Sequence, residues 1–210
     1  MPDYHDFVFD TDERRFIGKF DEMYREEERL GFDSWKQDDL QSRDDAAVIR
    51  RILDGRRYDQ VVDLGCGKGA LTNQLSEIAL STTGLDISET AVNVARSRYK
   101  TIKFEVLNLN SASDVSQLLS GIRKASNGSM LVVISQVLSY LSSWREILEV
   151  VLNFCNDLVI ALYLPDDPIG FVKNRYELER SIRQYGHLLE WLESIETRQH
   201  VVLASRQVDW

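Results

Sequence analysis

The sequence predicts an α/β protein in which seven strands form one mainly parallel sheet with helices on both faces. Candidate strands and helical segments alternate from residue 60 to residue 164, as repeated βα units do. Residues 130–134 are all apolar, which is typical of a central strand buried on both faces. Only residues 195–199 separate the last two strands, so this link permits an antiparallel hairpin and excludes a parallel crossover.

The first 45 or so residues differ in composition from the rest of the chain. Apolar and aromatic side chains recur at roughly helical spacing in the charge-dense stretch 16–30, which predicts an amphipathic helix that Gly31 ends. A second helix is expected at about 39–53. We expect residues 1–210 to form a single domain in which residues 1–55 are a helical extension that closes over the sheet as a lid. The alternative, compatible with the first, is that its apolar side chains are ordinary core on the sheet.

The remaining elements follow in order along the chain. The predicted strands are 60–64, 82–86, 102–107, 130–135, 158–164, 187–194 and 200–205. Helices between the first five are expected at about 70–79, 88–98, 113–124 and 142–155. After a loop bounded by prolines at 165–168, a last helix is predicted over 171–184.

Composition excludes several classes of function. The net charge of −9 disfavours a nucleic-acid binder, and no apolar run is long enough to cross a bilayer. The amino end is acidic, unlike a signal peptide, and Cys66 and Cys155 form neither a metal nor a disulfide framework. We therefore expect a cytoplasmic protein with no metal, nucleic-acid or membrane partner, acting as a monomer or homodimer.

The stretch VVDLGCGKGAL, residues 61–71, holds the main functional signal. Gly65, Gly67 and Gly69 follow the first strand, at the sheet edge where α/β proteins bind ligands. Glycines there permit a sharp turn and a close ligand approach. The spacing is GxGxG, which differs from the GxGxxG of dinucleotide-binding proteins.

Two acids strengthen this signal. Asp63 lies inside the first strand, where a buried position favours an apolar residue, so it is expected either to contact a ligand or to cap the glycine loop. Asp86 ends the next strand, where a carboxylate can accept both hydroxyls of a ribose. Its alternative role is to cap the helix that begins at Ser88, although Ser88 can itself serve as that cap.

The third strand ends in Asn108 and Leu109. The Asn108 side chain can accept a hydrogen bond from an adenine amino group, while the Leu109 amide meets a ring nitrogen. The alternative is that Asn108 is an ordinary turn residue, since asparagine is common in turns.

Four segments, VVDLGCGKGALT, GLDIS, FEVLNLN and LVVISQVLSYL, in this order and spacing resemble the class I S-adenosylmethionine-dependent methyltransferases. The resemblance covers about residues 58–144 and implies a Rossmann-like fold with strand order 3-2-1-4-5-7-6, strand seven antiparallel. More loosely, the N-terminal region resembles the branch that methylates sugars, natural products and nodulation factors.

The resemblance also implies a cofactor, S-adenosylmethionine, with S-adenosylhomocysteine as product. It assigns the methionine part of the cofactor to the loop of Gly65, Cys66, Gly67 and Gly69, with Asp63 on its amino group. It assigns the ribose to Asp86 beside Ile87, and Gln136 is expected near the cofactor. Lys68 departs from the small residues frequent in this family and is expected to face solvent or cover the methionine carboxylate.

Methyl transfer from a sulfonium mainly requires alignment and exclusion of water, so catalytic residues are hard to identify from sequence. The candidates are Tyr140 after the fourth strand, Asp166 with Asp167 after the fifth, and His200 at the start of the seventh. Their alternatives are packing, solvated turn residues and a satisfied histidine.

We predict methyl transfer to an oxygen or nitrogen of a small molecule, such as a sugar or secondary metabolite. The alternatives are a non-catalytic S-adenosylmethionine-binding partner of another protein and an NAD(P)-linked oxidoreductase.

Overall fold

The computed structural model describes residues 5–126 and 128–207, so the first four residues of the acidic amino end lie outside the described residues. Its main sheet has seven strands in the order β5-β4-β3-β6-β7-β9-β8. In chain order this is 3-2-1-4-5-7-6, and the seventh strand, β9, is antiparallel to both of its neighbours, which confirms the predicted topology. The strands are β3 (Tyr58–Leu64), β4 (Ala79–Asp86), β5 (Lys103–Val106), β6 (Met130–Ser135), β7 (Asp157–Tyr163), β8 (Gly186–Ser194) and β9 (Gln199–Arg206).

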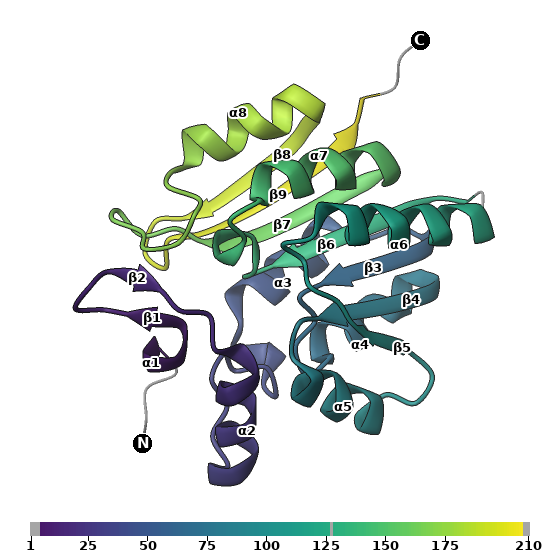
Figure 1. Cartoon of the computed structure of the whole chain (residues 1–210). Helices are drawn as coiled ribbons and strands as arrows, with labels where there is room; N and C mark the ends of the chain where they lie inside the picture. The colour runs from purple at the N-terminus through teal and green to yellow at the C-terminus, as the bar shows by residue number, and fades with distance from the viewer. Residues whose placement is uncertain (1–4, 127, 208–210) are drawn as a thin grey trace.

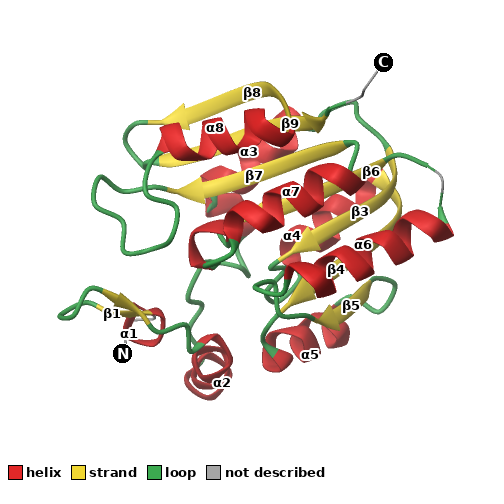
Figure 2. Cartoon of the chain, turned by 45° about the horizontal axis from the view of Figure 1, so that its top comes forward, coloured by secondary structure: helices red, strands yellow, loops and turns green. Residues whose placement is uncertain are grey.

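Helices cover both faces of the sheet (Figures 1 and 2). One face packs against α6 (Ala112–Ala125), α7 (Trp144–Phe154) and α8 (Arg175–Tyr185), and the other against α3 (Asp44–Ile52) and α4 (Ala70–Leu75), with α5 (Glu89–Arg98) beside β5. Along β6, Met130, Val132 and Ile134 face the first layer, whereas Leu131 and Val133 face the second. The apolar run at 130–134 is therefore explained by a strand with two buried faces.

Several predicted helices differ in their limits from the observed ones. The helix expected at 70–79 consists of α4 and a 3₁₀ turn, Ser76–Ile78. The last helix was expected from residue 171, but it begins at Arg175, because the Asn174 side chain accepts a hydrogen bond from the Glu177 amide and caps it. The helix expected at 39–53 is split into a 3₁₀ turn, η1 (Leu40–Ser42), and α3, because Arg43 between them is extended.

The N-terminal segment, residues 5–42, lies at the edge of the sheet where the parallel strands end (Figure 1). It contains α1 (His5–Val8), the two-stranded ribbon β1 (Phe9–Asp10) and β2 (Arg15–Phe16), α2 (Phe20–Leu30) and η1. Helix α2 begins four residues later than expected because Gly18, at a φ of 66°, turns the chain, and it ends at Gly31 as predicted.

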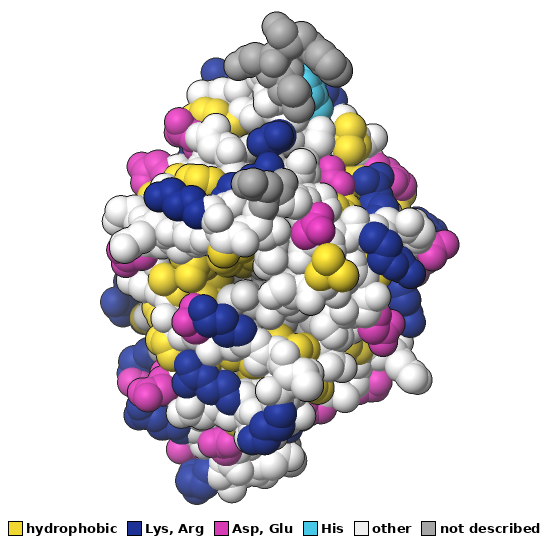
Figure 3. All heavy atoms as spheres, turned by 90° about the vertical axis from the view of Figure 1, so that its right-hand side faces the viewer, with side chains coloured by type: hydrophobic (Ala, Val, Ile, Leu, Met, Phe, Trp, Pro, Cys, Tyr) yellow, Lys and Arg dark blue, Asp and Glu magenta, His cyan; other side chains and the backbone are white. Residues whose placement is uncertain are grey.

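Residues 5–126 and 128–207 contain no helix that is both long and apolar enough to span a membrane, and no cluster of metal-ligating side chains. Cys66 and Cys155 are free and buried. On the face in Figure 3, basic and acidic side chains are interspersed.

Candidate active site

A cavity of about 650 Å³, called here the main cavity, lies at the carboxyl ends of β3, β4, β6 and β7. The N-terminal segment contributes part of its wall through side chains that include Phe16, Tyr24 and Trp35. The chain passes from β3 to β4 on one side and to β6 on the other, so the cavity lies at the switch point of the sheet. Its volume suits a nucleotide-sized ligand together with a small second molecule.

The glycine loop is shaped by other parts of the same chain. Gly65 and Gly67 have φ angles of 86° and 51°, which side chains rarely adopt. A Cβ atom at Gly65 would lie 2.1 Å from Val137 Cγ2, and one at Gly67 would lie 2.2 Å from Gln37 Oε1. The sequence interpretation reserved this space for a ligand, but the atoms closest to these two positions belong to the protein itself.

Asp63 is buried near the end of β3 and lines the main cavity. Its Oδ2 accepts a hydrogen bond of 2.6 Å from Thr72 Oγ1, whereas Oδ1 is buried with no hydrogen-bond partner among the described residues. Burial raises the pKa of Asp63 to about 6, against the opposing effects of Thr72 and Arg43. A buried carboxylate oxygen without a donor is suited to a positively charged hydrogen-bond donor on a ligand.

Asp86 ends β4 and has both of its oxygens directed at backbone amides. Oδ2 accepts from the Gly67 amide at 2.8 Å and Oδ1 from the Ser88 amide at 2.9 Å. Burial raises the pKa of this carboxyl, and these amides oppose the shift. The carboxylate thus braces the glycine loop, and Ser88 caps α5 by accepting from the Ala91 amide. Each oxygen retains lone-pair capacity for a ligand hydroxyl.

The other predicted cofactor residues divide into two groups. Cys66, Ile87, Asn108 and Leu109 line the main cavity with Asp63, Gly65 and Asp86, whereas Gly67 and Gly69 do not line it. The Asn108 side-chain oxygen accepts from the Asn110 amide at 3.0 Å, which is the turn role that was its alternative.

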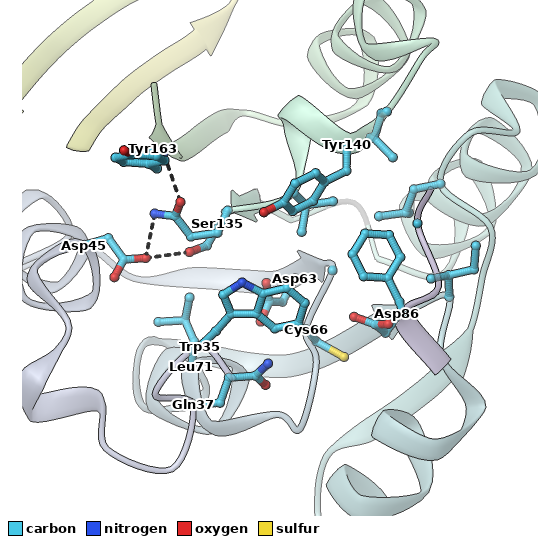
Figure 4. Close-up of a pocket in the computed structure, with 18 of the residues that line it drawn as sticks. Trp35, Gln37, Asp45, Asp63, Cys66, Leu71, Asp86, Ser135, Tyr140 and Tyr163 are labelled. Atoms are coloured by element: carbon cyan, nitrogen blue, oxygen red, sulfur yellow. Dashed lines mark hydrogen bonds between the residues drawn. The ribbon is translucent and has the colours of Figure 1, made fainter. Parts of the chain in front are cut away.

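Gln136 also lines the main cavity and belongs to a polar network that the sequence did not predict. Figure 4 shows Asp45, Ser135 and Tyr163 of this network. The backbone of Gln136 has a φ of 60°, and its side-chain Nε2 donates to Asp45 Oδ2 at 3.2 Å and to Gln199 Oε1 at 2.7 Å. Its Oε1 accepts from the Tyr163 amide at 2.9 Å. A strained non-glycine residue held by three partners is typical of a functional position.

Asp45 connects this network to Arg43. Its carboxylate accepts from Arg43 Nε at 3.0 Å and from Ser135 Oγ at 2.9 Å, and these bonds to Asp45 hold its pKa below the ordinary value despite its burial. No motif marks Asp45 in the sequence, because its partners Ser135 and Gln136 are 90 and 91 positions away.

Aromatic rings form the third side of the cavity. Tyr140 stacks on Phe16 with ring centroids 5.8 Å apart and packs against Phe20 at 5.4 Å, and Phe20 in turn contacts Trp35. In the view of Figure 4 the Trp35 ring overlaps Asp63, and Tyr140 lies above them. The aromatic content of the N-terminal stretch was the available signal for this wall.

Comparison with known proteins identifies this architecture. Residues 61–156 match the family model described as a methyltransferase domain. Residues 61–156 thus carry a methyltransferase domain. The matched residues include the glycine loop, Asp63, Asp86 and Gln136 of this methyltransferase.

Solved structures of similar fold agree at low sequence identity. A SAM-dependent methyltransferase from Anabaena variabilis has a TM-score of 0.71 at 10% identity, covering 90% of this chain and 93% of its own. The N-methyltransferase NodS from Bradyrhizobium japonicum, in complex with S-adenosylhomocysteine, has a TM-score of 0.66 at 18% identity and coverages of 87% and 97%. Magnesium protoporphyrin IX methyltransferase from Synechocystis, with bound SAM, scores 0.57 at 16% identity, with coverages of 88% and 84%. No curated protein matches the chain.

The methyltransferase site fits its cofactor, S-adenosylmethionine. Asp63 Oδ1 is a buried acceptor without a donor among the described residues, and the cofactor carries an ammonium group that can supply one. Asp86 lies on the same cavity wall, as a ribose-binding carboxylate of this fold should.

The three predicted catalytic residues are not brought together. Tyr140 lines the main cavity, but Asp166 and His200 line a separate cavity of about 450 Å³ beside the loop after β7. Asp166 is exposed and pairs with Arg198, while the buried His200 accepts a hydrogen bond from Trp191 at 3.3 Å. The His200 side chain contacts Trp191 of β8, and neither His200 nor Asp166 lines the main cavity, so the geometry gives no support to catalytic roles for these two residues.

Lys68 also departs from its predicted position. It was expected to face solvent or to cover the methionine carboxylate, but its side chain is only 6% exposed and contacts three acids of the N-terminal segment. The sequence interpretation was wrong here because it treated the segment 5–42 and the glycine loop separately.

Proposed function

We propose that the protein transfers the methyl group of S-adenosylmethionine to an oxygen or nitrogen of a small molecule in the main cavity. In this proposal Asp63 accepts a hydrogen bond from the cofactor ammonium, and Asp86, beside Ile87, accepts from the ribose hydroxyls. Cys66, Asn108 and Leu109 form the adenine side, where the Leu109 backbone supplies the contact to the ring. The observation that supports it most is the unpartnered Oδ1 of Asp63 inside a cavity that Asp86 also lines.

The cofactor supplies a methyl group activated by the positive charge on its sulfur. In the reaction, the acceptor lone pair forms the new bond to carbon while the carbon–sulfur bond breaks, and its electrons leave with S-adenosylhomocysteine. The acceptor then loses its proton to solvent or to a neighbouring group. The protein's part is to align the reacting atoms and to exclude water, which Phe16, Phe20 and Trp35 do by closing the cavity.

We place the acceptor between Tyr140 and the polar wall of Gln136, Tyr163 and Gln199. This space has an aromatic side that can cover an apolar part of the acceptor and an amide side that can orient a polar group. Tyr140 orients the acceptor in this proposal, and Gln136 belongs to the acceptor side more than to the cofactor side.

The charges of the cavity favour an amine acceptor over an anionic one. Among its described lining residues are four acids, Asp44, Asp45, Asp63 and Asp86, against a single arginine, Arg43, which is paired with Asp45. This negative surplus repels carboxylates and phosphates and attracts cations. The likeness in fold to the N-methyltransferase NodS supports the same preference.

The N-terminal segment is proposed to act as the lid of a single domain comprising residues 1–210, since it carries cavity-lining side chains at the mouth of the sheet. A cytoplasmic location and a monomeric or homodimeric state remain predictions from the sequence.

The test combines binding and turnover. Calorimetry with S-adenosylhomocysteine, S-adenosylmethionine and NAD should show binding of the first two alone, and tight NAD binding without them would reject the proposal. A methyl-transfer screen over amines, amino sugars, phenols and carboxylates should give products with the first three classes, amines leading. Binding without turnover on any of these would favour a non-catalytic binding partner.

A further inference from the structure

Lys68 lies in the glycine loop, yet its side chain reaches into the N-terminal segment. Its Nζ donates to Glu27 Oε1 at 2.5 Å, to Asp33 Oδ1 at 3.0 Å and to Asp38 Oδ2 at 2.9 Å. Burial alone favours the neutral amine, but the bonds to these carboxylates raise the pKa of Lys68 above its ordinary value. The ammonium therefore stays charged and fully coordinated.

The backbone of the same loop makes a second connection. The Lys68 amide donates to Gln37 Oε1 at 2.7 Å, and Gln37 Nε2 donates to the Tyr24 hydroxyl at 2.7 Å. Gln37 can occupy this position only because residue 67 is a glycine. A Cβ atom on residue 67 would lie 2.2 Å from the Oε1 atom of Gln37. The glycine loop therefore contacts the N-terminal segment through both the backbone amide and the side chain of Lys68.

The part of the segment that Lys68 holds also forms the cavity. Tyr24, Trp35 and Gln37 line the main cavity. Trp35 and Gln37 lie between Asp33 and Asp38 in sequence, and Tyr24 lies shortly before Glu27. At the other end of α2, Asp21 Oδ1 accepts from Ser88 Oγ at 2.8 Å and from the Thr90 amide at 3.0 Å, just after Asp86. Residues 20–38 therefore connect the two loops that hold the cofactor.

We propose that Lys68 is a positioning residue that couples the closed arrangement of residues 20–38 to the shape of the cofactor-binding loop. Ordering of the segment then strengthens cofactor binding, and cofactor binding orders the segment to the same degree, because coupling between two sites is reciprocal. This rests on the cofactor site described above and is independent of the acceptor.

The burial of Glu27 makes the coupling strong. Its side chain is 3% exposed, so without Lys68 a carboxylate would remain buried with its strongest partner gone. The segment can relieve this by moving away from the loop, which returns the Glu27 carboxylate to water. Asp38 retains Arg98 of α5 as a second partner, so detachment is expected to begin around Glu27.

The test uses the full chain and four proteins: wild type, Lys68→Met, Lys68→Met with Glu27→Gln, and Lys124→Met as a control on an exposed lysine of α6. The double variant removes the buried unpaired charge, so it remains informative where the single variant folds poorly. Calorimetry gives the affinity for S-adenosylhomocysteine, and hydrogen–deuterium exchange with and without this ligand gives the order of residues 20–38.

In wild type and Lys124→Met, the ligand should slow exchange in residues 20–38. In Lys68→Met and the double variant, affinity should fall about tenfold, within the usual range for coupled sites, and ligand-dependent protection of residues 20–38 should be lost while β3 and β6 keep theirs. A purely structural role would lower the melting temperature but leave that ligand-dependent protection intact, which would overturn the proposal. Wild-type affinity in the double variant would also overturn it, whereas absence of ligand binding in wild type would reject the cofactor site itself.

Discussion

The two walls of the main cavity are supplied by the chain in different ways. Asp63, Gly65, Asp86 and Asn108 stand at the ends of three successive strands, within fifty positions of one another. The facing wall takes Tyr24 and Trp35 from the N-terminal segment, Gln136 from the loop after β6 and Gln199 from the start of β9. The first wall repeats a local pattern, whereas the second exists only when distant segments meet.

This difference indicates which wall serves cofactor binding and which serves acceptor choice. The wall built from adjacent βα units is the proposed cofactor side, and its residues hold one another through loop amides, as Asp86 does with Gly67. The facing wall is held by side-chain hydrogen bonds between remote segments, such as those of Gln136 with Asp45 and Gln199. Cofactor chemistry belongs to the first wall and acceptor choice to the second in this interpretation.

The strongest test of the first wall is Asp86→Ala. It removes the proposed ribose acceptor and leaves the Gly67 and Ser88 amides without their partner, so cofactor affinity should fall by about 1–3 kcal/mol. Calorimetry with S-adenosylhomocysteine measures this change. Unchanged affinity would leave Asp86 only its loop-bracing role.

Asp63→Asn tests the other acid of that wall and has two opposite effects. Cofactor affinity should fall by about 1–2 kcal/mol through loss of the charged acceptor. In the ligand-free wild type, the pKa of about 6 lies above the ordinary 3.8, so the stability linked to protonated Asp63 is complete below pH 3.8 and lost as pH rises through 6. Asp63→Asn should therefore raise the free energy of unfolding by about 1–3 kcal/mol at pH 8 and much less at pH 4.

Urea unfolding of the two ligand-free proteins at both pH values gives this comparison. A variant less stable than wild type at pH 8 would contradict it. In the wild type, affinity for S-adenosylhomocysteine should weaken as pH falls below 6, since the protonated carboxyl no longer attracts an ammonium.

Tyr140→Phe tests the facing wall with a smaller change. The ring keeps its packing against Phe16 and Phe20 while the hydroxyl is removed, so acceptor KM or kcat should change by about two- to tenfold, the range of one hydrogen bond. Steady-state kinetics with the best acceptor of the screen provides the measurement. A matching loss of cofactor affinity would place Tyr140 on the cofactor side instead.

Asp166→Asn is expected to have the smallest effect. Its carboxylate is exposed, pairs with Arg198 and lies outside the main cavity, so activity should stay within about twofold of wild type, as exposed pairs contribute little. A large loss of kcat with unchanged stability would show that Asp166 acts in catalysis. It would then contradict the assignment of the active site to the two walls of the main cavity.

The sequence by itself determined the sheet, its order through a family resemblance, and the first wall of the site. Strand periodicity, the glycine loop and the acids ending two strands are local patterns, and parallel strands bring their carboxyl ends together without further information. Two helix limits were not predicted, because a side-chain cap at Asn174 decides one and the extended backbone of Arg43 decides the other.

Tertiary structure alone decided the rest. In the folded chain Lys68 is buried against three acids of the N-terminal segment. Asp166 and His200 line a separate cavity, and Gln136 is hydrogen-bonded to Asp45. A charged side chain in a sequence is equally suited to solvent or to a partner, and only packing shows which segment meets it. The physical reason is that desolvation and pairing depend on neighbours in space, whereas strand and turn formation depend largely on neighbours in the chain.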